Sequence, residues 1–162
     1  RRNKFLFNLC DTLKGNTLLL YQMVEKHGMV LYKLCQKLDR VLHFVYGGVD
    51  GEKREEIRRL TEKSNKRLII ASYGTFSTGV NIKNLHNIIF ASPSKSRIRN
   101  LQSIGRGLRL GDNKVNATLY DIADNLTYKS KENFTLKHFQ ERINIYTEEE
   151  FDYEMHNIDL KE

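Results

Sequence analysis

Apolar residues follow two alternating patterns along this chain. Continuous apolar runs predict β-strands at residues 17–21, 41–46, 67–71, 87–91 and 117–122. Apolar residues three or four positions apart predict helices at residues 1–14, 23–38, about 51–63, 97–110 and 134–146. These strands do not alternate polar with apolar residues, and helices separate them along the chain. Both features are typical of a parallel sheet covered on both faces. The pattern therefore predicts an α/β fold.

Turn and capping residues mark where several of these elements begin and end. Gly15-Asn16 ends the first predicted helix, Gly47-Gly48 ends the second strand, and Asp50 is placed to cap the helix that follows. Residues 73–81 are rich in Gly and Thr, and residues 151–160 fit neither pattern.

The residues at the ends of the predicted strands are the first place to look for chemistry. In an open α/β sheet the functional loops lie at the carboxyl ends of the strands. These ends are Tyr21-Gln22, Tyr46-Gly47-Gly48, Ser72-Tyr73-Gly74, Ser92-Pro93 and Asp121. We expect them to gather along one edge of the sheet.

Charge and composition narrow the class of partner. The 162 residues include 27 Lys and Arg against 20 Asp and Glu, a net charge of +7 that favours a polyanion, nucleic acid first. We find no apolar stretch of about 20 residues and no signal peptide, so no membrane partner is expected. Cys10 and Cys35 lack metal-ligand spacing, and the histidines are scattered, so buried thiols and no metal site are expected. Because the chain opens on Arg1, we expect a fragment of a longer protein.

Residues 97–110 carry an unusual set of arginines. On a helix, four polar side chains of this segment fall within an arc of roughly 80°, beside an apolar stripe. They are those of Arg99, Gln102, Arg106 and Arg109. Guanidinium groups on one face suit phosphate oxygens. A solvated basic helix face is the alternative.

The string Gln102-x-x-Gly105-Arg106-x-x-Arg109 resembles motif VI of superfamily 2 helicases and translocases, and the resemblance extends over residues 17 to about 123. Residues 17–21 resemble motif IV, residues 71–82 resemble motif V, and Tyr46-Gly47-Gly48 with Arg54-Glu55-Glu56-Ile57 resembles the family's glycine loop and helix start. The resemblance implies a RecA-like parallel β-sheet sandwiched by helices. It also implies an N-terminal helix or interdomain linker at 1–15, the RecA-like helicase C-terminal domain at 16–130 and a helical extension at 131–162.

The resemblance also assigns roles to residues. Gln102, Arg106 and Arg109 are the implied catalytic residues, and Gly79 and Asn81 are implied to bind nucleotide. The implied nucleic-acid contacts are Gly47, Gly48, Ser72, Tyr73, Thr75, Lys95 and Arg97. Many members carry Thr where this chain has Tyr73 or Gly74, so the motif V residue that contacts phosphate stays open. A plain turn at Gly47-Gly48 and a solvated helix start at Lys95 are the alternatives.

Two further groups of residues have side chains suited to chemistry. Asp121 and Asp124 suggest a metal or acid–base site, but no third ligand accompanies them, so this interpretation is disfavoured. Four tyrosines suit either base stacking or the core, and the core is favoured. They are Tyr73, Tyr120, Tyr128 and Tyr146.

The phage recombination-repair helicases are the part of the superfamily that this sequence most resembles. The residues that carry this are 71–74, 76–79, 83–86 and motif VI. The resemblance implies an ATP-dependent DNA helicase that acts on branched DNA or RNA–DNA hybrids in the cytoplasm of a phage-infected bacterial cell. Since no P-loop is present, ATP and Mg²⁺ are expected to bind mainly to an N-terminal RecA-like domain, and this chain alone is expected to be inactive. A non-catalytic binding module, an RNA helicase and the motor of a restriction system are the alternatives.

Overall fold

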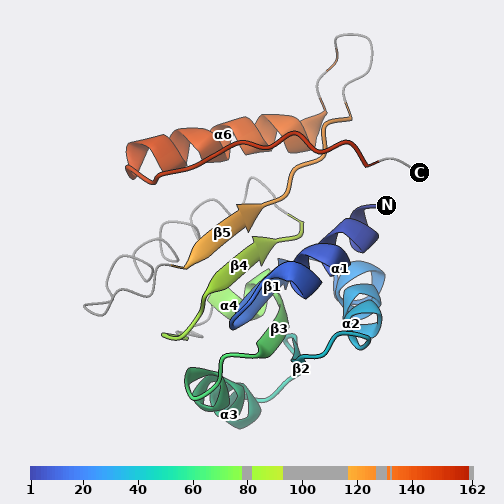
Figure 1. Ribbon diagram of the computed structural model, residues 1–162, viewed down its shortest axis with the longest axis vertical. Helices are drawn as coiled ribbons and strands as arrows, with labels where there is room; N and C mark the ends of the chain where they lie inside the picture. The colour runs from blue at the N-terminus through green and yellow to red at the C-terminus, as the bar shows by residue number, and fades with distance from the viewer. Residues whose placement is uncertain (78–81, 93–116, 127–130, 132, 161–162) are drawn as a thin grey trace.

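The computed structural model describes residues 1–77, 82–92, 117–126, 131 and 133–160 (Figure 1). Within these residues the strands are β1 (Thr17–Tyr21), β2 (Val41–Val45), β3 (Arg67–Ser72), β4 (Asn87–Phe90) and β5 (Thr118–Asp121). The helical elements are α1 (Arg2–Thr12), the π-helical turn η1 (Val24–Gly28), α2 (Met29–Cys35), α3 (Gly51–Glu62), α4 (Tyr73–Ser77) and α6 (Phe134–Glu148). The five predicted strands are confirmed to within a residue or two at their ends.

The strands form one parallel sheet in the order β2-β3-β1-β4-β5. The central strand β1 pairs with β3 on one side and with β4 on the other, so that Leu19 lies opposite Ile70 and Ile89. The predicted parallel α/β architecture is therefore confirmed.

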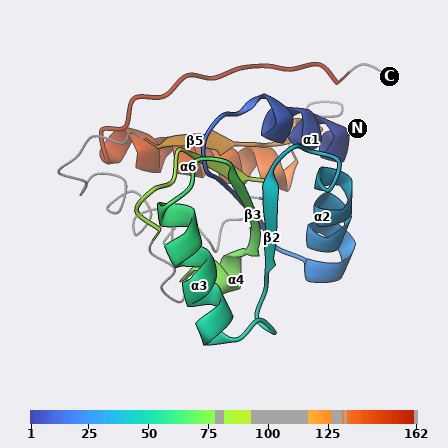
Figure 2. The same ribbon diagram turned by 60° about the horizontal axis from the view of Figure 1, so that its bottom comes forward.

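Each face of the sheet supports its own apolar core. Because side chains alternate along a strand, Leu18 and Leu20 of β1 point into one core and Leu19 and Tyr21 into the other. Helices α1 and α2 cover the Leu19 face with Leu6, Cys10, Leu31 and Cys35. Ile57 of α3 and Tyr146 of α6 cover the Leu18 face. Figure 2 shows α2 and α3 on opposite sides of β2 and β3.

Two predicted elements differ from the structure. The single helix predicted at residues 23–38 is a π-helical turn followed by α2, which ends at Cys35. The ring of Tyr21 requires glycine at the end of this turn, because a Cβ on Gly28 would lie 2.3 Å from its Cζ. The Gly- and Thr-rich segment, for which no element was expected, forms α4 over residues 73–77. The predicted helix at 97–110 lies outside the described residues, and the predicted domain boundaries stay a prediction.

Helix α3 begins as predicted. The carboxylate of Asp50 accepts a hydrogen bond of 2.8 Å from the backbone N–H of Lys53, which is the expected N-terminal cap. The cap fixes where the chain turns after β2 and so places the first turn of α3 beside the sheet edge.

The buried side chain of Asn16 joins four segments at the amino-terminal edge of the sheet. Its amide nitrogen donates to the backbone carbonyls of Thr61, Ser64 and Asn84, at 2.6 to 2.9 Å. Its amide oxygen accepts from the N–H of Arg67, at the start of β3, at 3.0 Å. One side chain therefore holds the end of α3 and the starts of β1 and β3 together.

The backbone around Asn16 adds a third strand, β4, to this junction. The carbonyl of Asn16 accepts hydrogen bonds from the N–H groups of His86 and Asn87, where β4 begins. Its N–H donates to Nδ1 of His86 at 3.0 Å. Gly15 has a φ of +85°, and a Cβ there would lie 2.6 Å from the ring of His86, so this position requires glycine.

Arg40 makes a second junction at the same edge. Its guanidinium donates to the carbonyls of Cys10 (3.0 Å) and Leu13 (3.3 Å) at the end of α1. It also donates to the carbonyls of Gly15 and Arg67, the latter at 3.1 Å. Arg40 therefore supplies hydrogen bonds to carbonyls that a helix end leaves without partners.

We predict that Asn16→Ala lowers the free energy of unfolding by about 3 kcal/mol, because several buried N–H and C=O groups lose their partners together. Urea denaturation of the purified chain measures the change. Asn65→Ala, at an exposed position next to Ser64, is the control and is expected to leave the midpoint unchanged. Equal midpoints for the two variants would contradict the role assigned to Asn16.

Candidate nucleic-acid interface

The carboxyl ends of the strands meet along one edge of the sheet, as predicted for parallel strands. The end of β2 makes a tight turn in which the N–H of Val49 donates to the carbonyl of Tyr46 at 2.9 Å. Gly47 and Gly48 are both exposed in this turn. A Cβ on Gly48 would lie 2.7 Å from the ring of Tyr46, whereas Gly47 faces open space. The backbone at Gly47 is therefore open to a close approach by a ligand.

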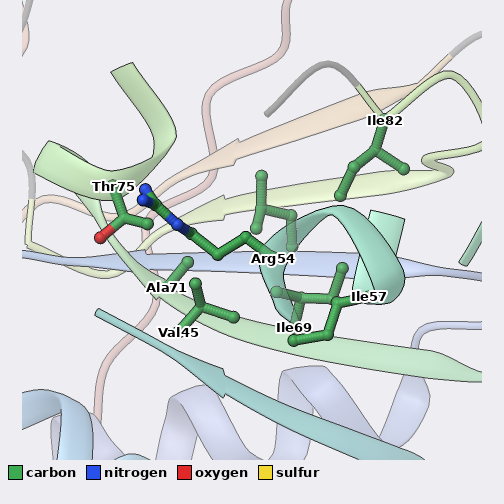
Figure 3. Close-up of a pocket in the computed structure, with 8 residues that line it drawn as sticks. Val45, Arg54, Ile57, Ile69, Ala71, Thr75 and Ile82 are labelled. Atoms are coloured by element: carbon green, nitrogen blue, oxygen red, sulfur yellow. The ribbon is translucent and has the colours of Figure 1, made fainter. Parts of the chain in front are cut away.

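A narrow apolar hollow lies between α3 and the sheet, close to α4. It is lined by Leu18, Val45, Arg54, Ile57, Ile69, Ala71, Thr75 and Ile82. Figure 3 shows the side chain of Arg54 reaching from α3 across the hollow, with its guanidinium directed toward Thr75. Its Nε donates to the carbonyl of Asp50 at 3.4 Å. Among the described residues, no carboxylate lies within ion-pair distance of Arg54.

The segment after β3 turns its polar side chains inward. Ser72 and Thr75 are 9% and 4% exposed, and their hydroxyls share a hydrogen bond of 2.7 Å. Tyr73 is 3% exposed, and its ring packs against that of Phe90 with centroids 5.7 Å apart. The structure gives these three side chains an internal role in shaping α4. The phosphate contacts implied for them stay a prediction.

The structure therefore brings Gly47, Gly48, Ser72, Tyr73 and Thr75 to the ends of the neighbouring strands β2 and β3. The other residues assigned from the sequence lie outside the described residues. These are Gly79, Asn81, Lys95, Arg97, Gln102, Arg106 and Arg109. Arg54 belongs to the segment that resembles the family's helix start, but the resemblance implies no role for it. Its place at the first turn of α3, directly after the glycine turn, is the signal that points to it.

The two aspartates at the end of β5 and just beyond it are both paired with arginines. Asp121 accepts hydrogen bonds from Nε (2.6 Å) and Nη2 (2.8 Å) of Arg142 on α6, and both side chains are almost fully buried. The hydroxyl of Tyr146 donates to the same carboxylate at 2.7 Å, and burial, with the charge of Asp121, raises the pKa of Tyr146. Asp124 pairs with Arg2. In the described part of the chain, no three His, Cys, Asp or Glu side chains are grouped as metal ligands.

Two of the four tyrosines weighed for base stacking belong to the core, Tyr73 and Tyr146. Tyr120 is partly buried against the α1–α2 side, and Tyr128 lies outside the described residues. The thiols of Cys10 and Cys35 are free and buried, as expected. None of the helices in the described ranges is long and apolar enough to cross a membrane.

The strand order and the layered helices define a RecA-like domain of the kind found as the second domain of helicases. The helicase conserved C-terminal domain model matches residues 2–111. This chain belongs to that family.

The chain is 35% identical over 173 residues to the ATP-dependent DNA helicase uvsW of Enterobacteria phage T4, a match that covers 99% of the chain and 34% of the relative. The crystal structure of T4 UvsW matches with a TM-score of 0.76 and 37% identity, covering 95% of this chain and 34% of that one. The chain thus spans about a third of the length of this relative.

Two other matches are more distant. A putative ATP-dependent RNA helicase L396 of Acanthamoeba polyphaga mimivirus is 30% identical over 146 residues, which cover 88% of the chain and 27% of the relative. The C-terminal domain of the DEAD-box protein Dbp5 matches with a TM-score of 0.65 at 14% identity, covering 91% of this chain and 79% of that one. The Dbp5 match supports the fold alone.

We predict that Asp121→Asn lowers the free energy of unfolding by about 3 kcal/mol, because the guanidinium of Arg142 would stay buried without its counter-charge. Asp124→Asn, which breaks a pair with about a quarter of each side chain exposed, is expected to lower it by less than about 1 kcal/mol. Chemical denaturation with and without Mg²⁺ measures both. Stability that rises with Mg²⁺ in the wild type and in neither variant would contradict a purely internal role for these carboxylates.

Proposed function

We propose that this chain is the second motor domain of an ATP-dependent superfamily 2 DNA helicase or translocase that acts on branched DNA or RNA–DNA hybrids in phage recombination and repair. The similarity to T4 UvsW over 99% of the chain carries this proposal. The glycine turn after β2 and the guanidinium of Arg54 support it, because both lie at the sheet edge where ligands of open α/β sheets bind.

The proposed catalytic residues are Gln102, Arg106 and Arg109, with Gly79 and Asn81 beside the nucleotide. Arginines positioned against a transferring phosphoryl group stabilise its charge, an effect worth about 10³- to 10⁵-fold in rate. The sequence contains no P-loop. ATP and Mg²⁺ are therefore proposed to bind mainly to an N-terminal RecA-like domain of the same polypeptide, which completes the cleft.

The proposed nucleic-acid path runs along the carboxyl edge. The backbone N–H groups at Gly47 and Gly48 and the guanidinium of Arg54 suit phosphate oxygens. The segment from Ser72 to Thr75 shapes the neighbouring turn. Lys95 and Arg97 are proposed to add electrostatic attraction that does not depend on base sequence. Closing and reopening of the cleft would then shift the two domains along the strand, in the cytoplasm of the infected cell.

An RNA substrate is the second candidate, because the mimivirus relative is named as a putative RNA helicase. Comparing stimulation of ATP turnover in the full-length protein by forked DNA, by an RNA–DNA hybrid and by RNA distinguishes the two. Stimulation by RNA alone would replace the DNA assignment.

We predict that Arg109→Ala in the full-length protein abolishes DNA-stimulated ATP turnover and leaves DNA affinity nearly unchanged, because the proposed guanidinium contacts the nucleotide and not the DNA. A steady-state ATPase assay and a DNA-binding titration measure the two properties. The isolated chain is expected to show no turnover. Parallel loss of turnover and DNA affinity would contradict the role assigned to Arg109.

We predict that Arg54→Gln in the full-length protein lowers affinity for single-stranded DNA about tenfold, because one charge-assisted phosphate contact is lost. The slope of log affinity against log salt should become shallower by about 0.7. Fluorescence anisotropy titrations at several salt concentrations measure both. Arg59→Gln, an exposed position on the same helix, is the matched control. Equal effects of the two substitutions would leave only general electrostatics and remove Arg54 from the DNA path.

A further inference from the structure

Four aromatic rings form a connected group at the carboxyl end of β2, on the side of the sheet that α2 covers. The ring of Phe44 stacks on that of Tyr21 in β1, with centroids 5.8 Å apart, and on that of Tyr32 in α2, at 5.1 Å. It also packs against the ring of Tyr46, at 5.4 Å and an angle of 45°. Tyr21 is fully buried, whereas Tyr46 is 37% exposed. The group therefore extends from the core to the surface, and the proposed function assigns no role to any of its rings.

The ring of Tyr46 is held in place at the exposed end of this group. Phe44 supports it from the strand, and Gly48 lies beside it, because a Cβ added at Gly48 would be 2.7 Å from its Cε2. The carbonyl of Tyr46 accepts a hydrogen bond of 2.9 Å from the N–H of Val49, which closes the turn beside the ring. A side chain that is already ordered loses little conformational entropy when a ligand binds to it. The exposed part of Tyr46 is therefore a prepared surface for a flat ligand.

The two faces of β2 offer different chemistry at this turn. Because side chains alternate along a strand, Val45 points into the core beneath α3 and Phe44 into the core beneath α2. Tyr46 lies on the α2 side, in contact with Phe44. Arg54 lies on the α3 side, over the hollow that Val45 lines. Since α2 and α3 lie on opposite sides of β2 (Figure 2), an aromatic ring and a guanidinium flank the glycine turn.

A nucleotide in a single strand carries the two groups that such a turn would receive. Its phosphate is an anion, and its base has two flat π-faces. Proteins that bind single strands without sequence preference combine positive charge along the backbone path with aromatic side chains on which bases stack. An exposed tyrosine alone is common and requires no ligand. Here the ring is fixed, it adjoins a turn with open backbone at Gly47, and a guanidinium lies across the strand.

We propose that Tyr46 is a base-stacking site for single-stranded nucleic acid, at which one base lies on the ring while the adjoining phosphate meets the Gly47-Gly48 turn and Arg54. The inference rests on the proposed function, because it adds a base contact to the nucleic-acid path at the carboxyl edge. Stacking does not depend on which base is present. A strand can therefore move past Tyr46 whatever its sequence.

Two substitutions of Tyr46 and two oligonucleotides test the proposal in the full-length protein. Tyr46→Leu removes the ring and keeps apolar bulk, and Tyr46→Phe keeps the ring. The oligonucleotides are a single-stranded DNA and an abasic DNA of the same length, which has the same phosphates and no bases. Fluorescence anisotropy titrations at several salt concentrations measure affinity and its salt dependence, and thermal unfolding of each variant is measured in parallel.

We expect Tyr46→Leu to lower affinity for the normal strand about tenfold, which is within the range for loss of one base–aromatic stack. Affinity for the abasic strand should change less than about twofold, and the salt slope should stay that of the wild type, because no phosphate contact is lost. Tyr46→Phe should match the wild type on both strands. Arg54→Gln should instead weaken binding of both strands and make the salt slope shallower.

Tyr153→Leu is the matched control, because Tyr153 is also an exposed tyrosine packed on another ring, at 46% exposure, but it follows α6 on the other side of the sheet. It should leave both affinities unchanged. The same titrations with RNA identify the strand that supplies the base. A loss on Tyr46→Leu that is confined to RNA with bases would confirm the stacking site and assign it to RNA.

The outcomes separate this inference from the proposed function. If Arg109→Ala leaves ATP turnover intact, the motor role fails, whereas the base-dependent loss on Tyr46→Leu still supports the stacking site. If Arg54→Gln behaves as expected and Tyr46→Leu binds the normal strand like the wild type, only the stacking site fails. Equal losses on normal and abasic strands, a loss on Tyr46→Phe as large as on Tyr46→Leu, or an equal loss on Tyr153→Leu would each overturn it.

Discussion

The buried amide of Asn16 is the contact on which the arrangement of this domain depends. A parallel sheet holds its strands through evenly spaced backbone hydrogen bonds, and those bonds alone do not bring the segments between the strands to one place. Asn16 does so by bonding to the end of α3, the start of β3 and the segment before β4. Arg40 adds the end of α1. The amino-terminal edge is thereby closed by buried polar contacts.

The opposite edge of the sheet, where the strands end, carries the proposed functional residues. At the carboxyl edge several contacts join residues close in sequence. The hydroxyls of Ser72 and Thr75, three residues apart, bond to each other. A Cβ added at the exposed Gly47 would have no neighbour within 4 Å. Turns that are individually shaped but weakly tied to each other can meet a ligand or a second domain without disturbing the core. The His27–Ser92 hydrogen bond and the contacts of Arg2 with Asp124 and with the carbonyl of Ala91 are among the exceptions, since they join separate segments.

The sequence predicted the sheet well because β1, β3 and β4 are buried on both faces and therefore consist of continuous apolar runs. It also predicted the Asp50 cap, which is local. It did not predict the π-helical turn, because the spacing of apolar residues indicates a helix at 23–38 but not its hydrogen-bond pattern. The resemblance implies phosphate contacts for Ser72 and Thr75, which stay a prediction, and it gave no sign that their hydroxyls share a buried hydrogen bond. The pairs His27–Ser92 and Asp121–Arg142 lie 65 and 21 residues apart, and no local pattern links them.

Internal ion pairs show which positive charges behind the net charge of +7 are already neutralised. Several arginines are already neutralised within the fold: Arg142 by Asp121, Arg2 by Asp124, and Arg58 by Glu55 and Glu62. Arg54 is not, among the described residues, and it lies over a hollow with apolar walls, where an unscreened charge interacts more strongly than on an open surface. A phosphate arriving at this edge would therefore meet a guanidinium that gives up no carboxylate partner in order to bind it.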